Sequence, residues 1–277
     1  MKWRAERLIY LTDNEFAEIS AYIKRNFGVN LDKKKSLIEG RLSNHLIALG
    51  YDNYDDYFQY ARADKTGDEM SVLINKLTTN HTYFFREQEH FNFFKNTVLP
   101  WIDQKLESRD LRVWSAGCSS GQEPYTLSML TLDYLGANAS KWDSSILATD
   151  ISNKVLLSAK EGIYSEEQIS SLPEGYQKRF FRHIGEGRYS VNEELKKNVI
   201  YNYLNLLSPF QFKRPFQAIF CRNVMIYFEA SLKQELVKKF YDVLLPGGYL
   251  FVGLSESLSG LKHNFQSESP SIYKKVV

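Results

Sequence analysis

The segment from Arg112 to Tyr125, RVWSAGCSSGQEPY, constrains the fold of this chain more than any other. A short apolar run passes into a loop of small residues, and Gln122, Glu123 and Pro124 then suit the first turn of a helix. Gly117 and Gly121 would let backbone amides approach a ligand closely. The pattern predicts a buried strand, a ligand-binding loop and a helix, although an ordinary strand-to-helix turn would have the same pattern.

Glu123 narrows the choice of ligand for this loop. The N-terminus of a helix attracts phosphate, and a carboxylate in the first turn opposes that attraction. The GxGxxG spacing of dinucleotide sites is also absent, because only Gly117 and Gly121 are present. An acid here favours a ligand with hydroxyls or a positive charge, such as a ribose or an amino group. The loop therefore favours S-adenosylmethionine over a dinucleotide.

The pattern of apolar residues divides the chain near residue 80. Before it, apolar residues recur at helical spacing, and the region 1–80 is predicted to be an all-helical domain with a linker. Asp13 and Asp32 are predicted N-caps, and Gly28 and Gly50 are predicted helix ends, so we expect two helices of roughly 15 and 18 residues.

Short apolar runs alternate with helical segments after residue 110, which is typical of an α/β domain. A second domain is therefore predicted at 81–277, in keeping with a length of 277 residues. The predicted strands are 111–116, 145–150, 198–204, 216–221, 248–254 and 271–277, and the predicted helices are 122–136, 152–161 and 231–244.

Polar residues follow the next two strands of the predicted sheet. In a doubly wound sheet the acid that ends the second strand can accept both ribose hydroxyls, and Asp150 has that place. The alternative for Asp150 is an N-cap of the next helix. Asn205 and Leu206 end the third strand, where an amide could read an adenine edge and an apolar side chain could pack on the ring. Three strand ends thus indicate an adenosyl ligand.

Composition limits the classes of protein to consider. With 43% hydrophobic and 25% charged residues, the chain is expected to be globular and soluble. The absence of a long apolar run and of a signal peptide, with only Cys118 and Cys221, predicts a cytoplasmic location. A net charge of +2 does not favour wholesale nucleic-acid binding. The histidines show no metal-ligand spacing, so we expect no metal, and we expect a monomer.

Four separated segments make the chain similar to a known family over nearly its whole length. The segments are TTNHTYFFREQEHF (78–91), VWSAGCSSGQEPYTL (113–127), IFCRNVMIYF (219–228) and LPGGYLFVGLSESL (245–258). The first and third are not general methyltransferase motifs. The chain resembles the CheR family, the chemoreceptor glutamate O-methyltransferases of bacterial chemotaxis.

The resemblance implies a fold and a reaction. It implies an N-terminal all-helical domain that docks on receptors, a Rossmann-like methyltransferase domain, and a small antiparallel β subdomain inserted at about 164–197. It also implies transfer of a methyl group from S-adenosylmethionine to receptor glutamates, which yields glutamyl methyl esters and S-adenosylhomocysteine. A scaffold that senses these cofactors without transfer is the alternative, and a nucleic-acid methyltransferase ranks below both because CRNVMIYF replaces the motif expected for base flipping.

The resemblance also implies roles for individual residues. Those implied to contact the cofactor are Asn80, Thr82, Arg86, Gly117, Glu123, Asp150, Asn205, Leu206, Arg222 and Asn223. Arg86 and Tyr227 are implied to face the transferring methyl group. Because a glutamate is ionised at neutral pH, no general base is needed, and we expect Arg86 to orient the carboxylate rather than clamp it. The alternative for Arg86 is a structural pair with Glu87 or Glu89.

A basic segment is the candidate surface for receptor binding. Residues 22–50 hold six basic and two acidic side chains, and the partner contacts are expected at Lys33, Lys34, Lys35 and Arg41. A solvated helix face would have the same composition. Some relatives hold a receptor's C-terminal peptide by strand addition to the β subdomain. Here the turn RHIGEGRYS is short, so we predict that this pentapeptide tether is not bound.

Overall fold

The computed structural model describes residues 8–78, 81–105 and 109–276. The chain forms two compact units. One, the helical unit, comprises residues 1–80 with 152–154 and 227–229. The other, the sheet unit, comprises 81–151, 155–226 and 230–277. None of the helices in the described ranges is both long and apolar enough to cross a membrane.

The helical unit confirms the predicted helix ends and corrects the predicted starts. Its helices are α1 (Asp13–Phe27), α2 (Lys35–Leu49), α3 (Tyr54–Ala63) and α4 (Asp68–Leu77). Gly28 and Gly50 end α1 and α2 in the left-handed conformation. Asp13 is not the N-cap of α1, because Thr12 forms a capping box with Glu15. Asp32 is not an N-cap either, since α2 begins at Lys35 and is 15 residues long.

The sheet unit contains a seven-stranded sheet in the order β6-β2-β1-β7-β8-β10-β9. Its strands are β1 (Val113–Ala116), β2 (Ile146–Asp150), β6 (Val199–Tyr203), β7 (Phe216–Cys221), β8 (Leu244–Val252), β9 (Phe265–Ser269) and β10 (Ile272–Lys275). The strands from β6 to β8 run parallel, and β10 is antiparallel to both β8 and β9. The Rossmann-like α/β fold predicted from the sequence is confirmed.

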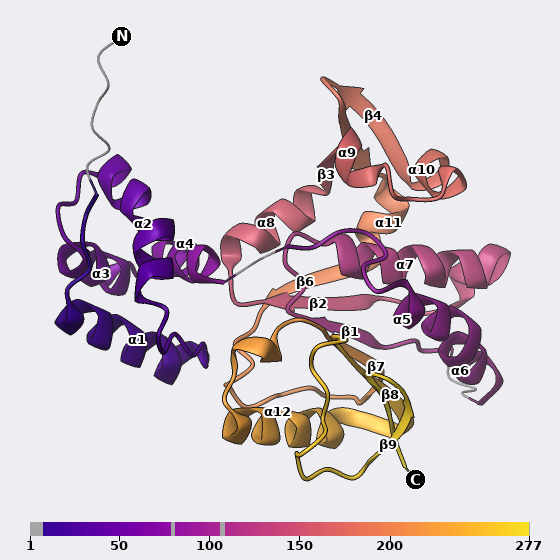
Figure 1. Cartoon of the computed structure of the whole chain (residues 1–277). Coiled ribbons are helices and arrows are strands. Elements are labelled where there is room, and N and C mark those ends of the chain that lie inside the picture. Colours follow the sequence, from indigo (N-terminus) through magenta and orange to yellow (C-terminus); the bar gives the residue numbers. More distant parts are fainter. Residues whose placement is uncertain (1–7, 79–80, 106–108, 277) are drawn as a thin grey trace. The chain divides into compact units, whose positions relative to one another are not determined.

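Helices cover both faces of this sheet (Figure 1). The regular and short helices are α5 (Gln88–Phe93), α6 (Leu99–Lys105), α7 (Gln122–Leu135), α8 (Asn153–Glu161), α9 (Glu166–Ile169), α10 (Glu174–Phe180), α11 (Glu193–Lys197) and α12 (Ala230–Val243), with a π-helix η1 at Phe94–Val98 and 3₁₀ helices η2 and η3 at Gly136–Lys141 and Met225–Tyr227. Successive residues of β1 point to opposite faces. Trp114 therefore packs on Phe240 of α12, whereas Ser115 contacts Glu123 of α7.

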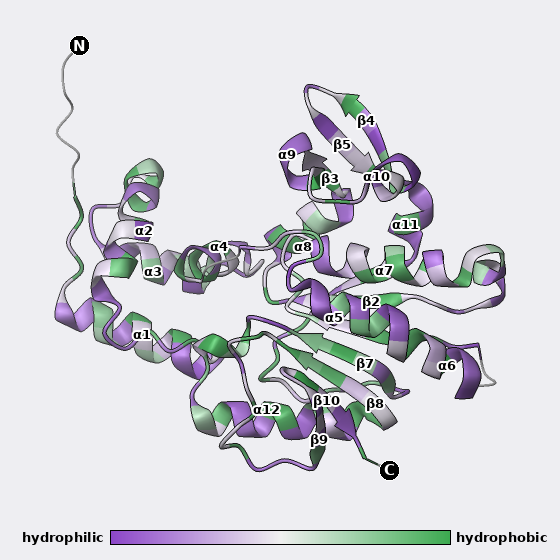
Figure 2. Ribbon diagram, turned by 45° about the vertical axis from the view of Figure 1, so that its right-hand side comes forward, coloured by the Kyte–Doolittle hydropathy of each residue, from purple (hydrophilic) through white to green (hydrophobic). Residues whose placement is uncertain are grey.

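Apolar residues (green in Figure 2) line the central strands, and β7 is buried along its whole length. Cys118 and Cys221 are both buried, as expected for small apolar residues. Cys118 follows β1 and Cys221 ends β7, and these two strands are neighbours in the sheet. The connection from β6 to β7 contains no helix and instead packs Phe210 and Phe212 on Trp114.

A second, three-stranded antiparallel sheet has the order β3-β5-β4. Its strands are β3 (Ile163–Ser165), β4 (Phe181–Gly185) and β5 (Arg188–Val191). The turn between β4 and β5 uses positive φ angles at Gly185, Glu186 and Gly187. The small antiparallel sheet implied by the resemblance is thus present between β2 and β6 in the chain.

Candidate functional site

The loop after β1 is held against the end of β2. The backbone N–H groups of Gly117 and Cys118 donate to the carbonyl of Thr149 at 2.8 and 2.9 Å. Gly117 has a φ of 88°, and a Cβ there would overlap the side chain of Val224. Gly121 has a φ of 95°, and a Cβ there would lie 2.9 Å from the Tyr164 hydroxyl. The two glycines are therefore required by the protein's own packing, in addition to any ligand.

Glu123 opens α7 with its carboxylate directed to the strands. One oxygen accepts from the Ser115 hydroxyl at 2.7 Å, and the other accepts from Arg222 Nη1 at 3.0 Å. Burial raises the pKa of the Glu123 carboxyl, although Arg222 opposes the shift. Arg222, directly after β7, thus connects the end of that strand to the first turn of α7.

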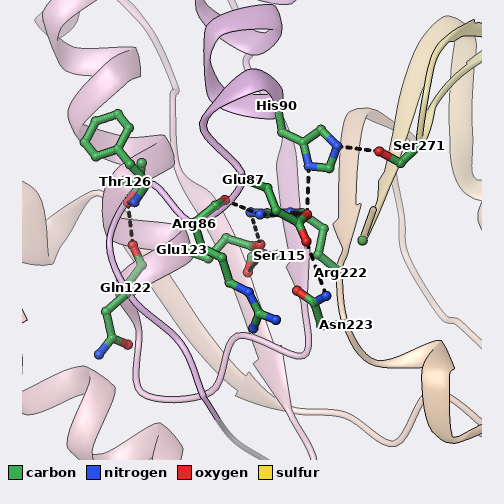
Figure 3. A network of polar contacts seen from close by, with 12 residues as sticks. Arg86, Glu87, His90, Ser115, Gln122, Glu123, Thr126, Arg222, Asn223 and Ser271 are labelled. Atoms are coloured by element: carbon green, nitrogen blue, oxygen red, sulfur yellow. Dashed lines mark hydrogen bonds and ion pairs between the residues drawn. The ribbon is translucent and has the colours of Figure 1, made fainter. Parts of the chain in front are cut away.

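Arg222 also contacts the segment that precedes α5 (Figure 3). Its Nη2 lies 3.1 Å from Glu87 Oε2 and also donates to the carbonyl of Arg86. Its guanidinium lies 5.0 Å from the centre of the Phe91 ring. The side chain of Arg222 is 3% exposed, and those of Glu87 and Glu123 are 12% and 14% exposed. One buried cation is therefore shared between two largely buried carboxylates, which we call the Glu87–Arg222–Glu123 triad.

Glu87 has further partners within the sheet unit. Its Oε1 accepts from Asn223 Nδ2 and from the backbone N–H of Leu254, each at 3.4 Å. Burial alone would raise the pKa of the Glu87 carboxyl, but Arg222 and these donors hold it below its ordinary value. Glu87 thus fastens the 81–87 segment to the ends of β7 and β8.

Glu256 is a buried acid that was not predicted from the sequence. It is 3% exposed and accepts from the backbone N–H groups of Asn223, Gly253 and Ile226 at 2.5, 2.7 and 2.9 Å. Burial raises its pKa. The only signal in the sequence is an acid in the GLSESL segment after a buried strand, and that pattern does not distinguish a surface acid from one that organises a loop.

Asp150 ends β2 beside the same loop. Its Oδ2 accepts from the backbone N–H of Ser119 at 2.9 Å, and its carbonyl accepts from the N–H of Leu204 at 3.0 Å. Asn205 follows at once, with its Oδ1 accepting from the N–H of Leu207 at 3.0 Å. The carboxylate of Asp150 is thus engaged with the loop after β1, and the three strand ends identified from the sequence are neighbours in the structure.

Arg86 does not form the ion pairs that were its structural alternative. In the described part of the chain, no ion pair joins Arg86 to Glu87 or Glu89, and its Nη1 donates to the carbonyl of His81 at 2.5 Å. Thr82, nearby in the same segment, is half-buried. Glu87 instead pairs with Arg222, which the sequence could not indicate.

The remaining predicted residues fall outside the described part of the chain or belong to the helical unit. Asn80 falls outside the described residues. Tyr227 is grouped with the helical unit, so its position is described within that unit only. In the helical unit, Lys35 pairs with Asp13 at 2.6 Å. Arg41 donates to the three carbonyls of residues 76–78 at 3.2 to 3.3 Å, at the end of α4.

Sequence comparison decides the family. Residues 80–273 match the family model described as CheR methyltransferase, SAM binding domain, and residues 14–78 match the one described as CheR methyltransferase, all-alpha domain. The chain belongs to the CheR methyltransferase family. The resemblance inferred from the four sequence segments is thereby confirmed.

Individual CheR relatives match over nearly the whole chain. A chemotaxis protein methyltransferase of Borreliella burgdorferi is 42% identical over 96% of this chain and 96% of its own length. That of Escherichia coli is 38% identical over 97% of this chain and 92% of its own length. That of Salmonella typhimurium is 36% identical, with 95% and 90% covered. The chain therefore spans nearly the whole length of each of these relatives.

The side chains present fit the cofactor of the family. Asp150 supplies an acceptor at the end of β2, and Glu123 supplies a second one at the start of α7. The triad carries two carboxylates and one guanidinium, so with Asp150 the site is acidic overall. Such a site suits hydroxyls and positive charge and opposes phosphate. S-adenosylmethionine has a sulfonium, an amino group and ribose hydroxyls, so it fits.

His90 predicts a pH dependence of stability. It is 1% exposed, its Nε2 lies 2.6 Å from Ser271 Oγ, and burial followed by repulsion from Arg222 lowers its pKa to about 4. Between pH 6.5 and 4 the unfolded chain therefore binds a proton at His90 that the folded chain does not. As the pH falls from 6.5 to 4, His90 should therefore lower the free energy of unfolding by up to about 3 kcal/mol, while the raised pKa values of Glu123 and Glu256 act in the opposite direction.

The measurement is urea denaturation at a series of pH values, with His90→Gln as the comparison. The difference in free energy of unfolding between the wild type and the variant should change by up to about 3 kcal/mol between pH 6.5 and 4, because Glu87, Glu123 and Glu256 titrate in both proteins and cancel in the comparison. An unchanged slope in His90→Gln would show that another group is responsible.

Proposed function

We propose that this CheR protein transfers a methyl group from S-adenosylmethionine to glutamate side chains of chemoreceptors and releases S-adenosylhomocysteine. The observation that carries the proposal is the Glu87–Arg222–Glu123 triad, which joins the family-specific segment before α5 to the cofactor loop after β1. The products on the receptor would be glutamyl methyl esters. The alternative of a scaffold without transfer has no support in the relatives, which are named as methyltransferases.

Several residues would hold the cofactor in this proposal. Asp150 would accept from the ribose hydroxyls, Asn205 and Leu206 would contact the adenine, and Glu123 would face the positively charged part. The set implied by the family is completed by Gly117, Thr82, Asn80, Arg86, Arg222 and Asn223. When bound, S-adenosylmethionine supplies a methyl group on a positively charged sulfur, which makes that carbon electrophilic. The chain's own residues would bind this group and exclude water.

The acceptor needs orientation more than activation. A glutamate has an ordinary pKa near 4.3, so it reacts as the carboxylate that is already present at neutral pH. A general base or a metal is not required for this chemistry. Attack on a sulfonium neutralises one charge of each sign, so a poorly hydrated site favours the reaction. Arg86 and Tyr227 would orient the carboxylate beside the transferring methyl.

Arg86 should affect turnover more than cofactor affinity. Arg86 is half-buried and its Nη1 donates to the His81 carbonyl, and no acid among the described residues forms an ion pair with it. Replacement by methionine should lower kcat by roughly 100-fold, because misplaced reactants lose that order of rate. The Kd of S-adenosylhomocysteine, measured by calorimetry, should change by less than about threefold.

Arg86→Lys is the matched control for that experiment. It keeps the charge but loses the planar pair of donors, so kcat should lie between those of the wild type and Arg86→Met. If Arg86→Met instead weakened cofactor binding as much as it slowed turnover, Arg86 would act through its contact with the cofactor and not by orienting the acceptor.

The receptor contacts are proposed to involve the basic segment of the helical unit. Lys33 is exposed, whereas Lys34 lies 5.6 Å from the centre of the Tyr227 ring, and Lys35 and Arg41 bond within the unit. Lys33 is thus the better site for a charge-reversal test of salt-dependent receptor binding. We further propose a cytoplasmic monomer that does not bind a receptor C-terminal pentapeptide, and calorimetric titration with such peptides tests the last point.

Label transfer tests the proposed reaction. The protein is incubated with methyl-labelled S-adenosylmethionine and cytoplasmic receptor fragments, and the labelled product is exposed to mild base. The proposal predicts volatile methanol released from the receptor fragment. Cofactor binding without label transfer would favour the scaffold.

A further inference from the structure

Lys239 of α12 binds three successive carbonyls of the turn after β6. Its Nζ donates to the carbonyls of Leu206, Leu207 and Ser208 at 2.5, 3.1 and 2.9 Å. The same ammonium lies 4.5 Å from the centre of the Phe210 ring. One side chain thus contacts the whole turn that contains the proposed adenine residues.

The turn depends on this contact because of how its backbone groups are used. The N–H of Leu207 donates to Asn205 Oδ1, and the N–H of Ser208 donates to the carbonyl of Asn205 at 2.9 Å. These two bonds use the N–H groups of Leu207 and Ser208. The carbonyls of residues 206–208 accept from Lys239 instead. The bonds to Leu206 and Leu207 are partly buried and the bond to Ser208 is exposed. A carbonyl shielded from water is destabilising without a donor, so the first two bonds in particular favour the observed placement.

The connection from β6 to β7 explains why a side chain, and not the backbone, binds these carbonyls. This connection contains no helix, so the regular backbone hydrogen bonds of a helix do not fix its first residues. The ammonium of Lys239 is partly removed from water where it binds the turn. This burial lowers its pKa, and Glu235 opposes the shift. Placing a lysine there is costly unless the carbonyls replace that water.

The same turn is fastened to the ribose end of the site. The N–H of Leu204 donates to the carbonyl of Asp150, and the carboxylate of Asp150 accepts from the N–H of Ser119. One end of the turn is therefore set by β2 and the cofactor loop. Lys239 sets the other end, and with it the position of Asn205 and Leu206 relative to Asp150.

We propose that Lys239 is a positioning residue that sets the selectivity of the cofactor site for adenine. It acts through the turn of Asn205 and Leu206 and does not touch the cofactor. The inference rests on the proposed function, because it takes this turn as the adenine contact. Its consequence is that Lys239 governs discrimination between bases more than overall stability.

The test compares Lys239→Met with a neighbouring control. Methionine keeps the long apolar stem but has no donor, so the three carbonyls lose their partner. The control is Lys238→Met, since Lys238 is 74% exposed and forms a local ion pair with Asp242 at 2.8 Å. For each protein, calorimetry gives the Kd of S-adenosylhomocysteine and of S-inosylhomocysteine, in which a carbonyl oxygen replaces the adenine amino group.

The wild type and Lys238→Met should prefer the adenine compound to the same degree. In Lys239→Met that preference should fall by about tenfold, the effect of losing about one well-placed hydrogen bond. Lys239→Arg keeps donors and charge, so it should restore part of the preference. It also provides the comparison if Lys239→Met is too unstable to purify.

The possible results distinguish a failure of this inference from a failure of the proposed function. Equal preference in Lys239→Met and the wild type, even with weaker binding of both compounds, would make Lys239 a structural residue and overturn the inference. A wild type that binds both compounds equally would also overturn it. A wild type that binds neither would contradict the proposed function itself.

Discussion

Replacing Arg222 with methionine should lower the free energy of unfolding by about 3 to 5 kcal/mol, because two largely buried carboxylates lose their shared cation. Glu87 and Glu123 would then lie near each other without compensation, and both pKa values should rise. Urea denaturation measures the loss. Trp101, Trp114 and Trp142 lie in the sheet unit, so their fluorescence reports on this unit.

A second substitution shows whether charge is the cause. In the wild type, Glu87→Gln should destabilise, since the amide cannot replace the charged pair with Arg222. In the Arg222→Met background, the same substitution should stabilise, because it removes an unpaired charge. If Glu87→Gln changed stability equally in both backgrounds, the two residues would not be coupled and the triad would not act as a unit.

Asp150→Ala should weaken the binding of S-adenosylhomocysteine roughly 10- to 150-fold, as expected for loss of a hydrogen bond to a charged group. A carboxylate accepts several hydrogen bonds at once, so its bond to the Ser119 N–H is compatible with bonds from ribose hydroxyls. The substitution would remove both the acceptor and the support of the loop. Calorimetry with the purified variant gives the Kd directly.

Asp150→Asn is the control that keeps the shape of the side chain. Its one acceptor oxygen can still take the N–H of Ser119, so the loop should be preserved while ribose binding is weakened. We expect a Kd between those of the wild type and Asp150→Ala. Affinity in Asp150→Ala equal to that of the wild type would remove Asp150 from the cofactor site.

The local pattern of the chain predicted most of its fold. The strand, loop and helix of residues 112–125 are present as β1, the glycine loop and α7, because apolar runs and first-turn chemistry are properties of neighbouring residues. β9 was missed, since FQSES has one apolar residue at its end and lies at the edge of the sheet. The start of α1 was misplaced because Thr12 and Asp13 are both good caps, and only the bond from Glu15 distinguishes them.

The internal contacts of the site could not be predicted in the same way. Arg222 and Glu87 are 135 residues apart in the chain, and no spacing rule relates them. The family motifs indicated that both segments matter and implied that Arg222 contacts the cofactor, which stays a prediction. The pairing of its guanidinium with Glu87 and Glu123 had no signal in the sequence. Lys239 was missed for the same reason, because its partners are backbone carbonyls that carry no signal in the sequence.

The most direct test of the account is to locate the methyl group on a receptor. Cytoplasmic receptor fragments are incubated with the protein and S-adenosylmethionine, digested, and analysed by tandem mass spectrometry before and after mild base. We expect the mass of one methylene unit to be added to glutamate side chains, to be lost after base treatment, and to be absent when the protein is omitted. A methyl group on a nitrogen atom, or an unmodified receptor in the presence of protein that binds the cofactor, would contradict it.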